Sequence, residues 1–115
     1  MNRGDIVLIK YPFTDYSSEA VRPALVISSD AHSATNPDAI FIYISSVIEN
    51  PRPPDIVIGR NHPEFSRSGL KKDSVIKCDK IATLSKALAT RRLGEAGPEI
   101  MGLINTKLSE ILGLA

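Results

Sequence analysis

The sequence predicts an α+β fold in which a small, strongly bent antiparallel sheet or barrel is followed by a single C-terminal helix. Most apolar residues stand in short runs bounded by Pro, Gly, Asn and Asp, which is typical of strands joined by turns. Only the last segment changes to a helical period. The chain has 115 residues, 43% of them hydrophobic, so residues 1–115 are expected to form one domain with its own core.

Five short strands are expected in the first three quarters of the chain. They cover residues 6–9, 22–29, 39–46, 55–58 and 74–83. Residues 12–19 and 30–38 are polar and read as loops, and residues 60–70 read as a loop or one helical turn. Residues 88–93 fit a short strand or a helical turn equally well.

The C-terminal helix is expected to begin at Pro98, which stands at the first helical position and is followed by an acid in the first turn. Gly113 stands where a C-cap belongs. The apolar residues form one helical face, made of Ile100, Leu103, Ile104, Leu108, Ile111 and Leu112.

Charge is unevenly distributed along the chain. The formal net charge is only +1, but residues 60–94 carry nine Lys and Arg against three acidic residues. Such a stretch can be a footprint for a polyanion, or a solvated surface that balances an acidic half.

Most enzyme motifs are absent. The chain has no glycine-rich phosphate loop, no dinucleotide fingerprint and no zinc-protease motif. His32 and His62 would suit an acid–base pair, although loop histidines are commonly bystanders. With Cys78, which reads as a buried, inert thiol, they make a poor metal set. No metal and no cofactor is therefore expected.

No apolar run approaches the roughly 20 residues of a membrane helix, and no leader segment is visible before the first strand. The sequence therefore predicts a cytoplasmic protein.

Arg22 opens an otherwise apolar strand next to Pro23, where the core needs no guanidinium. Alternation along residues 39–46 puts Phe41, Tyr43 and Ser45 on one face of their strand. An arginine, a hydroxyl and an aromatic ring close together would suit a phosphate with an unstacked base beside it. A strand-edge arginine beside a polar strand end is the structural alternative.

Four motifs occur in an order that resembles a known family. They begin at Gly4-Asp5, at Val21-Arg22-Pro23, at Ile44-Ser45 and at Lys72-Asp73-Ser74. Together they resemble the MazF/PemK family of toxin endoribonucleases from residue 4 to about residue 84.

The resemblance implies an SH3-like barrel with a C-terminal helix, a homodimer, and cleavage of single-stranded RNA such as mRNA without a metal. It also implies an antitoxin partner whose acidic C-terminal tail occupies the RNA groove. The family's arginine maps to Arg22. Its hydroxyl residue, commonly Thr, maps to Ser45, or to Ser46 if the alignment slips by one residue.

RNA carries its own nucleophile, the 2′-hydroxyl, so cleavage needs no protein nucleophile. The expected products are a 2′,3′-cyclic phosphate and a 5′-hydroxyl. Lys71 and Lys72 are expected to hold the RNA backbone. Tyr43 remains a candidate RNA contact, and Tyr16, Asn61 or His62 would choose the base.

Two other functions remain open. The same barrel is known to host toxins that inhibit DNA gyrase by protein contact, and fold does not determine function. A non-catalytic module that binds RNA or protein is also compatible with the modest net charge. The Arg22-Pro23 element favours the ribonuclease.

Overall fold

The structure is a computed structural model that describes residues 1–10 and 21–114. The described strands form one six-stranded antiparallel sheet in the order β4-β5-β3-β2-β1-β6. Its strands are β1 (Asp5–Lys10), β2 (Val21–Val26), β3 (Asp38–Ser45), β4 (Asp55–Ile58), β5 (Ser74–Ser85) and β6 (Ala89–Glu95). Three helices and one 3₁₀ turn complete the described fold: α1 (Asp30–Thr35), α2 (Phe65–Ser68), η1 (Lys86–Leu88) and α3 (Pro98–Leu112).

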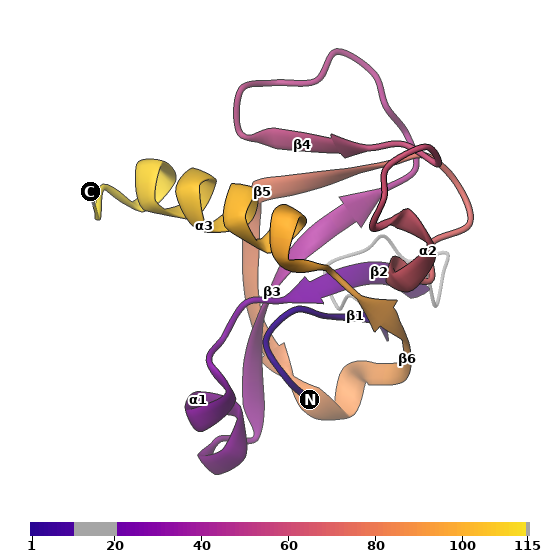
Figure 1. Ribbon diagram of the computed structural model, residues 1–115. Coiled ribbons are helices and arrows are strands. Elements are labelled where there is room, and N and C mark those ends of the chain that lie inside the picture. Colours follow the sequence, from indigo (N-terminus) through magenta and orange to yellow (C-terminus); the bar gives the residue numbers. More distant parts are fainter. Residues whose placement is uncertain (11–20, 115) are drawn as a thin grey trace.

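The expected bent antiparallel sheet with a C-terminal helix is confirmed (Figure 1). Among the described strands, β4 and β6 are the two edges and do not pair with each other, so the sheet is open rather than a closed barrel. Much of its bend lies in β5, which pairs with β3 in two parts. Ile42 is paired with Ile81, but the next residue, Tyr43, is paired with Lys77. Such a bulge turns the strand sharply and increases its twist.

One sequence expectation needs correction, and one open alternative is resolved. Residues 30–38 were expected to be a loop, but Asp30–Thr35 is helical because the Ser29 hydroxyl caps its first turn, accepting the His32 N–H at 3.1 Å. A helix this short carries no apolar period that the sequence could reveal. The ambiguous residues 88–93 fall within η1 and the sixth strand, β6.

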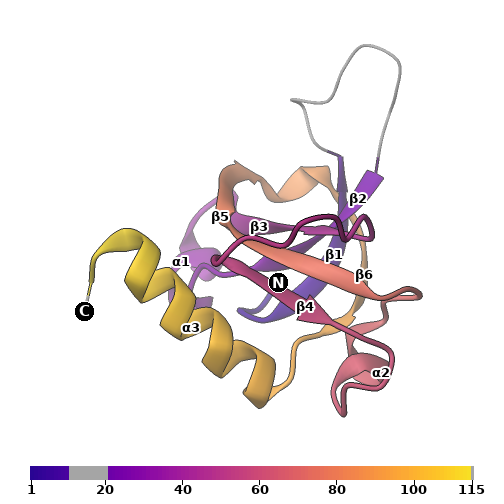
Figure 2. The same ribbon diagram turned by 90° about the horizontal axis from the view of Figure 1, so that it is seen from above.

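The central strands are buried on both faces. One core lies between the sheet and α3 and includes Ile6, Leu25, Ile42, Ile100 and Ile104. The other lies on the opposite face, inside the fold of β5 and β6, and includes Val7, Ile9, Val26, Phe41 and Leu84. Figure 2 shows α3 lying alongside the curved sheet, with its first turn near α2.

Cys78 belongs to the core under α3 and is fully buried, as expected. Burial, together with the charge of Asp55, raises the pKa of its thiol to about 11. The group is therefore protonated at neutral pH, consistent with an inert thiol.

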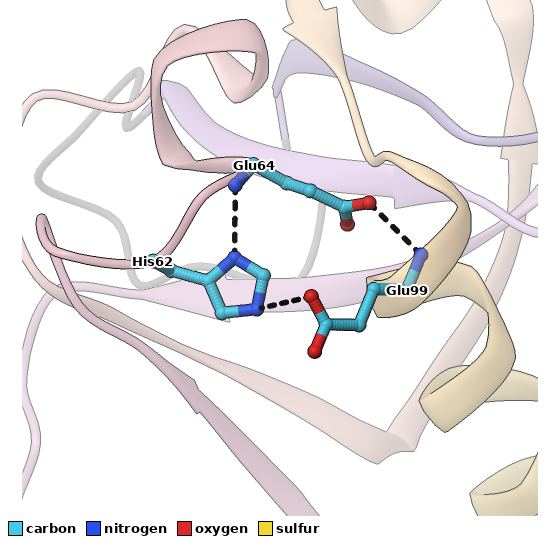
Figure 3. A group of neighbouring side chains, drawn as sticks. All are labelled: His62, Glu64 and Glu99. Carbon is cyan, nitrogen blue, oxygen red and sulfur yellow. Dashed lines mark hydrogen bonds and ion pairs between the residues drawn. The ribbon is translucent and has the colours of Figure 1, made fainter.

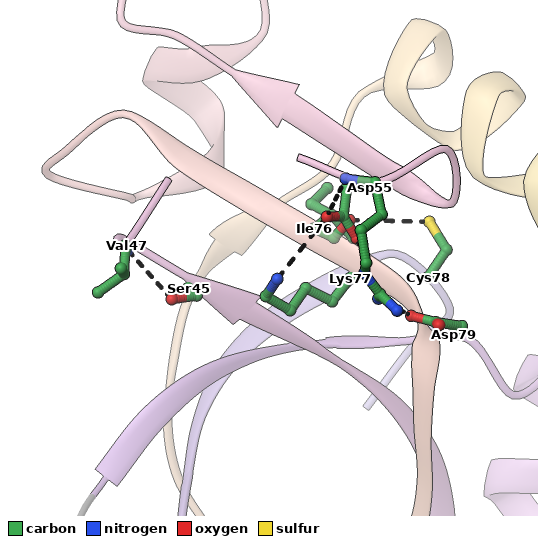
Figure 4. Close-up of polar contacts among 8 residues, drawn as sticks. Ser45, Val47, Asp55, Ile76, Lys77, Cys78 and Asp79 are labelled. Atoms are coloured by element: carbon green, nitrogen blue, oxygen red, sulfur yellow. Dashed lines mark hydrogen bonds and ion pairs between the residues drawn. The ribbon is translucent and has the colours of Figure 1, made fainter. Parts of the chain in front are cut away.

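Polar contacts tie β4 and its entry loop to the bend in β5 (Figure 4). The Arg52 guanidinium lies 2.7 Å from Asp79, on the bulge, and its hydrogen bond lowers the pKa of that carboxyl. The buried Asp55 carboxylate accepts the Arg52 backbone N–H at 3.0 Å and lies 3.7 Å from Lys77 Nζ. These contacts hold the short edge strand in place.

Candidate functional site

A groove of about 340 Å³ opens where β2 begins and β3 ends, between these strands and the loop that follows α2. It is lined by Leu8, Arg22, Pro23, Ile44, Ser45, Ser46, Val47, Gly69, Leu70, Lys71, Lys72, Ser74, Arg91 and Leu93. Five of the nine residues predicted as site residues are among them: Arg22, Ser45, Ser46, Lys71 and Lys72; Asn61 does not line this groove.

Arg22 and Ser45 are brought together by the register of β2 and β3. The paired residues run from Val26 with Phe41 to Ala24 with Tyr43. The ladder stops there, and Pro23 has no N–H with which to extend it. Continued by two residues, the same register sets Arg22 opposite Ser45. Because β2 and β3 are not paired beyond Ala24 and Tyr43, their backbones are free to separate at this end, where both strands line the groove.

The Ser45 hydroxyl is oriented by the turn that follows β3. Its Oγ accepts the backbone N–H of Val47 at 3.1 Å, as Figure 4 shows. This bond uses a lone pair of the oxygen and not its proton, so the hydroxyl can still donate that proton to a bound group. Ser46 is more exposed and also lines the groove.

Lys71 and Lys72 lie on the opposite wall, whose position depends on two glycines. Gly69 ends α2 in the left-handed conformation with φ of 73°, and a Cβ there would lie 2.1 Å from the Leu93 carbonyl oxygen. A Cβ at Gly94 would lie 2.3 Å from the Arg67 carbonyl oxygen. The backbones of α2 and β6 therefore touch directly, which holds the lysine loop against the sheet.

The groove is positively charged. Arg22, Lys71, Lys72 and Arg91 line it, and no Asp or Glu is among its described lining residues. None of these four cations forms an ion pair with another described residue, whereas three other arginines, Arg52, Arg67 and Arg92, are engaged by carboxylates. Four cations that pair with no carboxylate of the described residues would attract an anionic ligand.

Arg91 was not among the predicted site residues, although it belongs to the basic stretch of the sequence. Because its segment fits either a strand or a helical turn, the sequence does not show to which side the Arg91 side chain points. The pairing of β6 with β1 sets it opposite Leu8, at the rim of the groove.

Tyr43 and His62 lie outside the groove. Tyr43 is half-buried against the second core and lines a separate hollow with Asp79, Lys80, Ile81 and Ala82. Burial raises the pKa of its phenol. Although Tyr43 and Ser45 alternate onto the same face of β3, the structure does not place them around one hollow. Tyr16 lies outside the described residues.

His62 belongs to a cluster with Glu64 and Glu99 at the start of α3 (Figure 3). Its Nδ1 accepts the Glu64 N–H at 3.0 Å, so its Nε2, which lies 3.6 Å from a Glu99 oxygen, carries the proton. The Glu64 oxygens accept the N–H groups of Glu99 and Ile100 at 2.9 and 2.8 Å. Both carboxylate oxygens of Glu64 are thus already engaged in capping α3, and His62 Nδ1 is engaged by the Glu64 N–H, which argues against a metal centre.

The fold and the groove define a class: small α+β proteins whose bent antiparallel sheet presents a basic groove at its strand ends. A family model described as "PemK-like, MazF-like toxin of type II toxin-antitoxin system" matches residues 2–112. The chain belongs to this family, and the resemblance carried by its four motifs is confirmed. Within the described parts of the chain, no helix combines the length and apolar character needed to cross a bilayer.

Named relatives and solved structures agree with this assignment. Endoribonuclease EndoA of Bacillus subtilis is 29% identical, and the match covers 99% of this chain and 96% of the relative. Endoribonuclease MazF of Staphylococcus saprophyticus is also 29% identical, over 99% of this chain and 92% of the relative.

Two antitoxin complexes contain chains with a similar fold. A mycobacterial endoribonuclease solved with its cognate antitoxin has a TM-score of 0.78 and 23% identity, over 100% of this chain and 97% of that one. A MazE–MazF structure from Deinococcus radiodurans gives a TM-score of 0.75 and 20% identity, over 98% and 95% of the two chains. At these identities the two structures support the fold.

Proposed function

We propose that this chain is a metal-independent endoribonuclease that cleaves single-stranded RNA in the cytoplasm and acts as the toxin of a type II toxin–antitoxin pair. The observation that carries the proposal is the groove that Arg22 and Ser45 line together with two lysines, with no Asp or Glu among its described lining residues. Both named relatives are endoribonucleases, which supports the same reaction here.

The reaction is a transesterification within the RNA. The 2′-oxygen of one nucleotide attacks the adjacent phosphorus, the bond from phosphorus to the 5′-oxygen breaks, and a 2′,3′-cyclic phosphate forms. The 2′-hydroxyl loses one proton and the departing 5′-oxygen gains one, so the reaction consumes and releases no net proton. Arg22 binds the nonbridging oxygens, where negative charge develops, and its two parallel N–H groups match their spacing.

Ser45 supplies a second donor. With its oxygen held by the Val47 N–H, its proton is free to bind a phosphate oxygen and orient it against Arg22. Lys71 and Lys72 bind flanking phosphates from the opposite wall, which contributes affinity rather than sequence choice.

The composition of the groove favours chemistry without a metal. Its described lining residues include no His, Cys, Asp or Glu, which are the usual protein ligands of a catalytic cation. Arginine, which stays protonated in proteins, supplies the positive charge that a cation would otherwise provide.

The same groove suits the acidic tail of an antitoxin. The two structures with similar folds were solved with an antitoxin partner, and four unpaired cations are a target for carboxylates. We further propose a homodimer as the toxin assembly, and competition between antitoxin and RNA for the groove.

The test is cleavage of a long unstructured RNA in the presence of EDTA, with the 5′ ends of the products mapped. Wild type should cut at a short recurring sequence and leave 5′-hydroxyl ends. Arg22→Ala should be slower by about a hundred- to a thousandfold. Arg60→Ala is the matched control, because Arg60 is exposed and lies outside the groove.

Absence of cutting by wild type would refute the ribonuclease, and loss of activity in EDTA would refute metal independence. Equal cutting by wild type and Arg22→Ala would remove Arg22 from the site.

A further inference from the structure

A second hollow of about 260 Å³ is formed by the N-terminus, β1 and the edge strand β6, and it shares one lining residue with the groove. It is lined by Met1, Asp5, Val7, Ala89, Thr90, Arg91 and Arg92. Among the described residues, Arg91 is the one that lines both the groove and this second hollow. It therefore stands on the ridge that a polymer would cross in passing from one to the other.

The two neighbouring arginines of β6 differ in their partners. Arg92 Nε lies 3.1 Å from the buried Asp5 carboxylate, and its Nη2 lies 3.6 Å from Glu95. Arg91 is exposed and forms no ion pair with a described residue. The carboxylate in the second hollow is thus already neutralised by Arg92, while the charge of Arg91 is left available to a ligand.

The backbone of β6 accounts for this arrangement. Its pairing with β1 shifts register twice, once on each side of the Arg91–Arg92 pair. Bulges of this kind redirect side chains at the edges of sheets. Between the two shifts the pairing is regular, Arg91 with Leu8 and Arg92 with Val7, so the two side chains start toward opposite faces of the strand. Arg91 lines the groove as well as the second hollow, and Arg92 lines the second hollow.

We propose that Arg91 binds a phosphate of the RNA away from the cleaved bond and leads the strand over β6 into the second hollow. This inference rests on the proposed ribonuclease function and extends it. The substrate site would be longer than the groove, and its outer part would be governed by charge rather than by base identity.

The test is the affinity for single-stranded 2′-O-methyl RNA, which lacks the nucleophile and so stays intact. Binding is measured by fluorescence anisotropy for a series from about 4 to about 16 nucleotides, the range of common single-strand site sizes. The proteins are wild type, Arg91→Gln and the matched control Arg60→Gln.

Wild type should bind longer RNA more tightly than the shortest RNA, and Arg91→Gln should weaken the binding of long RNA about fivefold more than it weakens the binding of the shortest RNA. Its slope of log affinity against log salt on long RNA should fall by about 0.7, the contribution of one phosphate contact. Arg60→Gln should match wild type throughout.

Equal weakening of short and long RNA would make Arg91 a simple groove contact and overturn the extended path, as would no effect at any length. RNA cleavage by the same preparations is scored separately. If Arg91→Gln weakens long RNA selectively but wild type does not cleave RNA, the ribonuclease is refuted and the RNA path over β6 is retained. If wild type cleaves RNA but Arg91→Gln has no length-dependent effect on binding, the path is refuted and the ribonuclease is retained. Failure of wild type to bind any RNA would overturn both.

Discussion

A Cβ atom at Gly97 would lie 2.3 Å from Cδ of Glu64, so the Glu64 carboxylate reaches the start of α3 because residue 97 has no side chain. There it accepts the N–H groups of Glu99 and Ile100, which have no partner within the helix. Through this contact the segment before α2 is fastened to the C-terminal helix.

Replacing Glu64 by Gln should lower the free energy of unfolding by about 1 kcal/mol near neutral pH, through loss of a charged helix cap. Burial opposes ionisation of Glu64, but the hydrogen bonds from the Ile100 and Glu99 N–H groups, together with the nearby charge of Arg67, outweigh it. They lower its pKa below the ordinary 4.5. The carboxylate therefore contributes fully above about pH 4.5 and loses its contribution as the pH falls through the folded-state value.

Urea denaturation of wild type and Glu64→Gln at several pH values checks this prediction. The difference between them should be largest near neutral pH and shrink in acid. A constant difference across that range would contradict it.

Replacing Gly94 by Ala should destabilise the fold by about 1–3 kcal/mol, because the new methyl group would meet the Arg67 carbonyl oxygen, a backbone atom that cannot rotate away. Thermal denaturation measures the effect. Gly102→Ala is the matched control: nothing lies within 4 Å of a Cβ at this exposed position of α3. It should raise stability by about 1 kcal/mol through helix propensity alone. An unaltered Gly94→Ala protein would mean that α2 and β6 can separate freely.

Ser45→Ala should reduce the cleavage rate by about a hundredfold, because the donor oriented by Val47 is lost. Ser45→Thr keeps the hydroxyl and should retain activity. Ser46→Ala separates the two neighbouring hydroxyls and should have a small effect, since Ser46 lies one residue beyond the end of β3. Single-turnover kinetics of the three variants decides between them. A larger loss in Ser46→Ala would reassign the role.

The cleavage rate should rise steadily with pH from about 6 to about 9, because the described lining residues include no His or carboxylate that would titrate near neutrality as a general base. The measurement is kcat/KM in buffers of constant ionic strength. A bell-shaped profile would show that a titrating group from another part of the chain takes part.

The fold was largely predictable because its strands are short apolar runs punctuated by Pro and Gly, and α3 has a clear helical period from Pro98. The helix at Asp30–Thr35 was missed because one capping hydroxyl, Ser29, stabilises it rather than an apolar face. The position of the bend in β5 could not be predicted, because a bulge depends on the pairing partner.

The candidate groove was partly predictable. Arg22 and Ser45 stand out at strand ends, and Lys71 and Lys72 belong to a charged run. Arg91 did not stand out, because its place at the rim depends on the pairing of β6 with β1. Tyr43 fell outside because alternation assigns a face of a strand but not the position of that face around a curved sheet.

The residues of the groove stand on two kinds of support, which should accept amino-acid substitutions at different rates during evolution. Arg22 and Ser45 extend from strands packed on both sides, where few substitutions are tolerated, whereas Lys71 and Lys72 occupy a short exposed loop. Over generations that loop can exchange residues, and with them the strength with which it attracts a polyanion, while the strand ends stay aligned. Under the proposed function, related chains would then differ in affinity and still share one way of cutting.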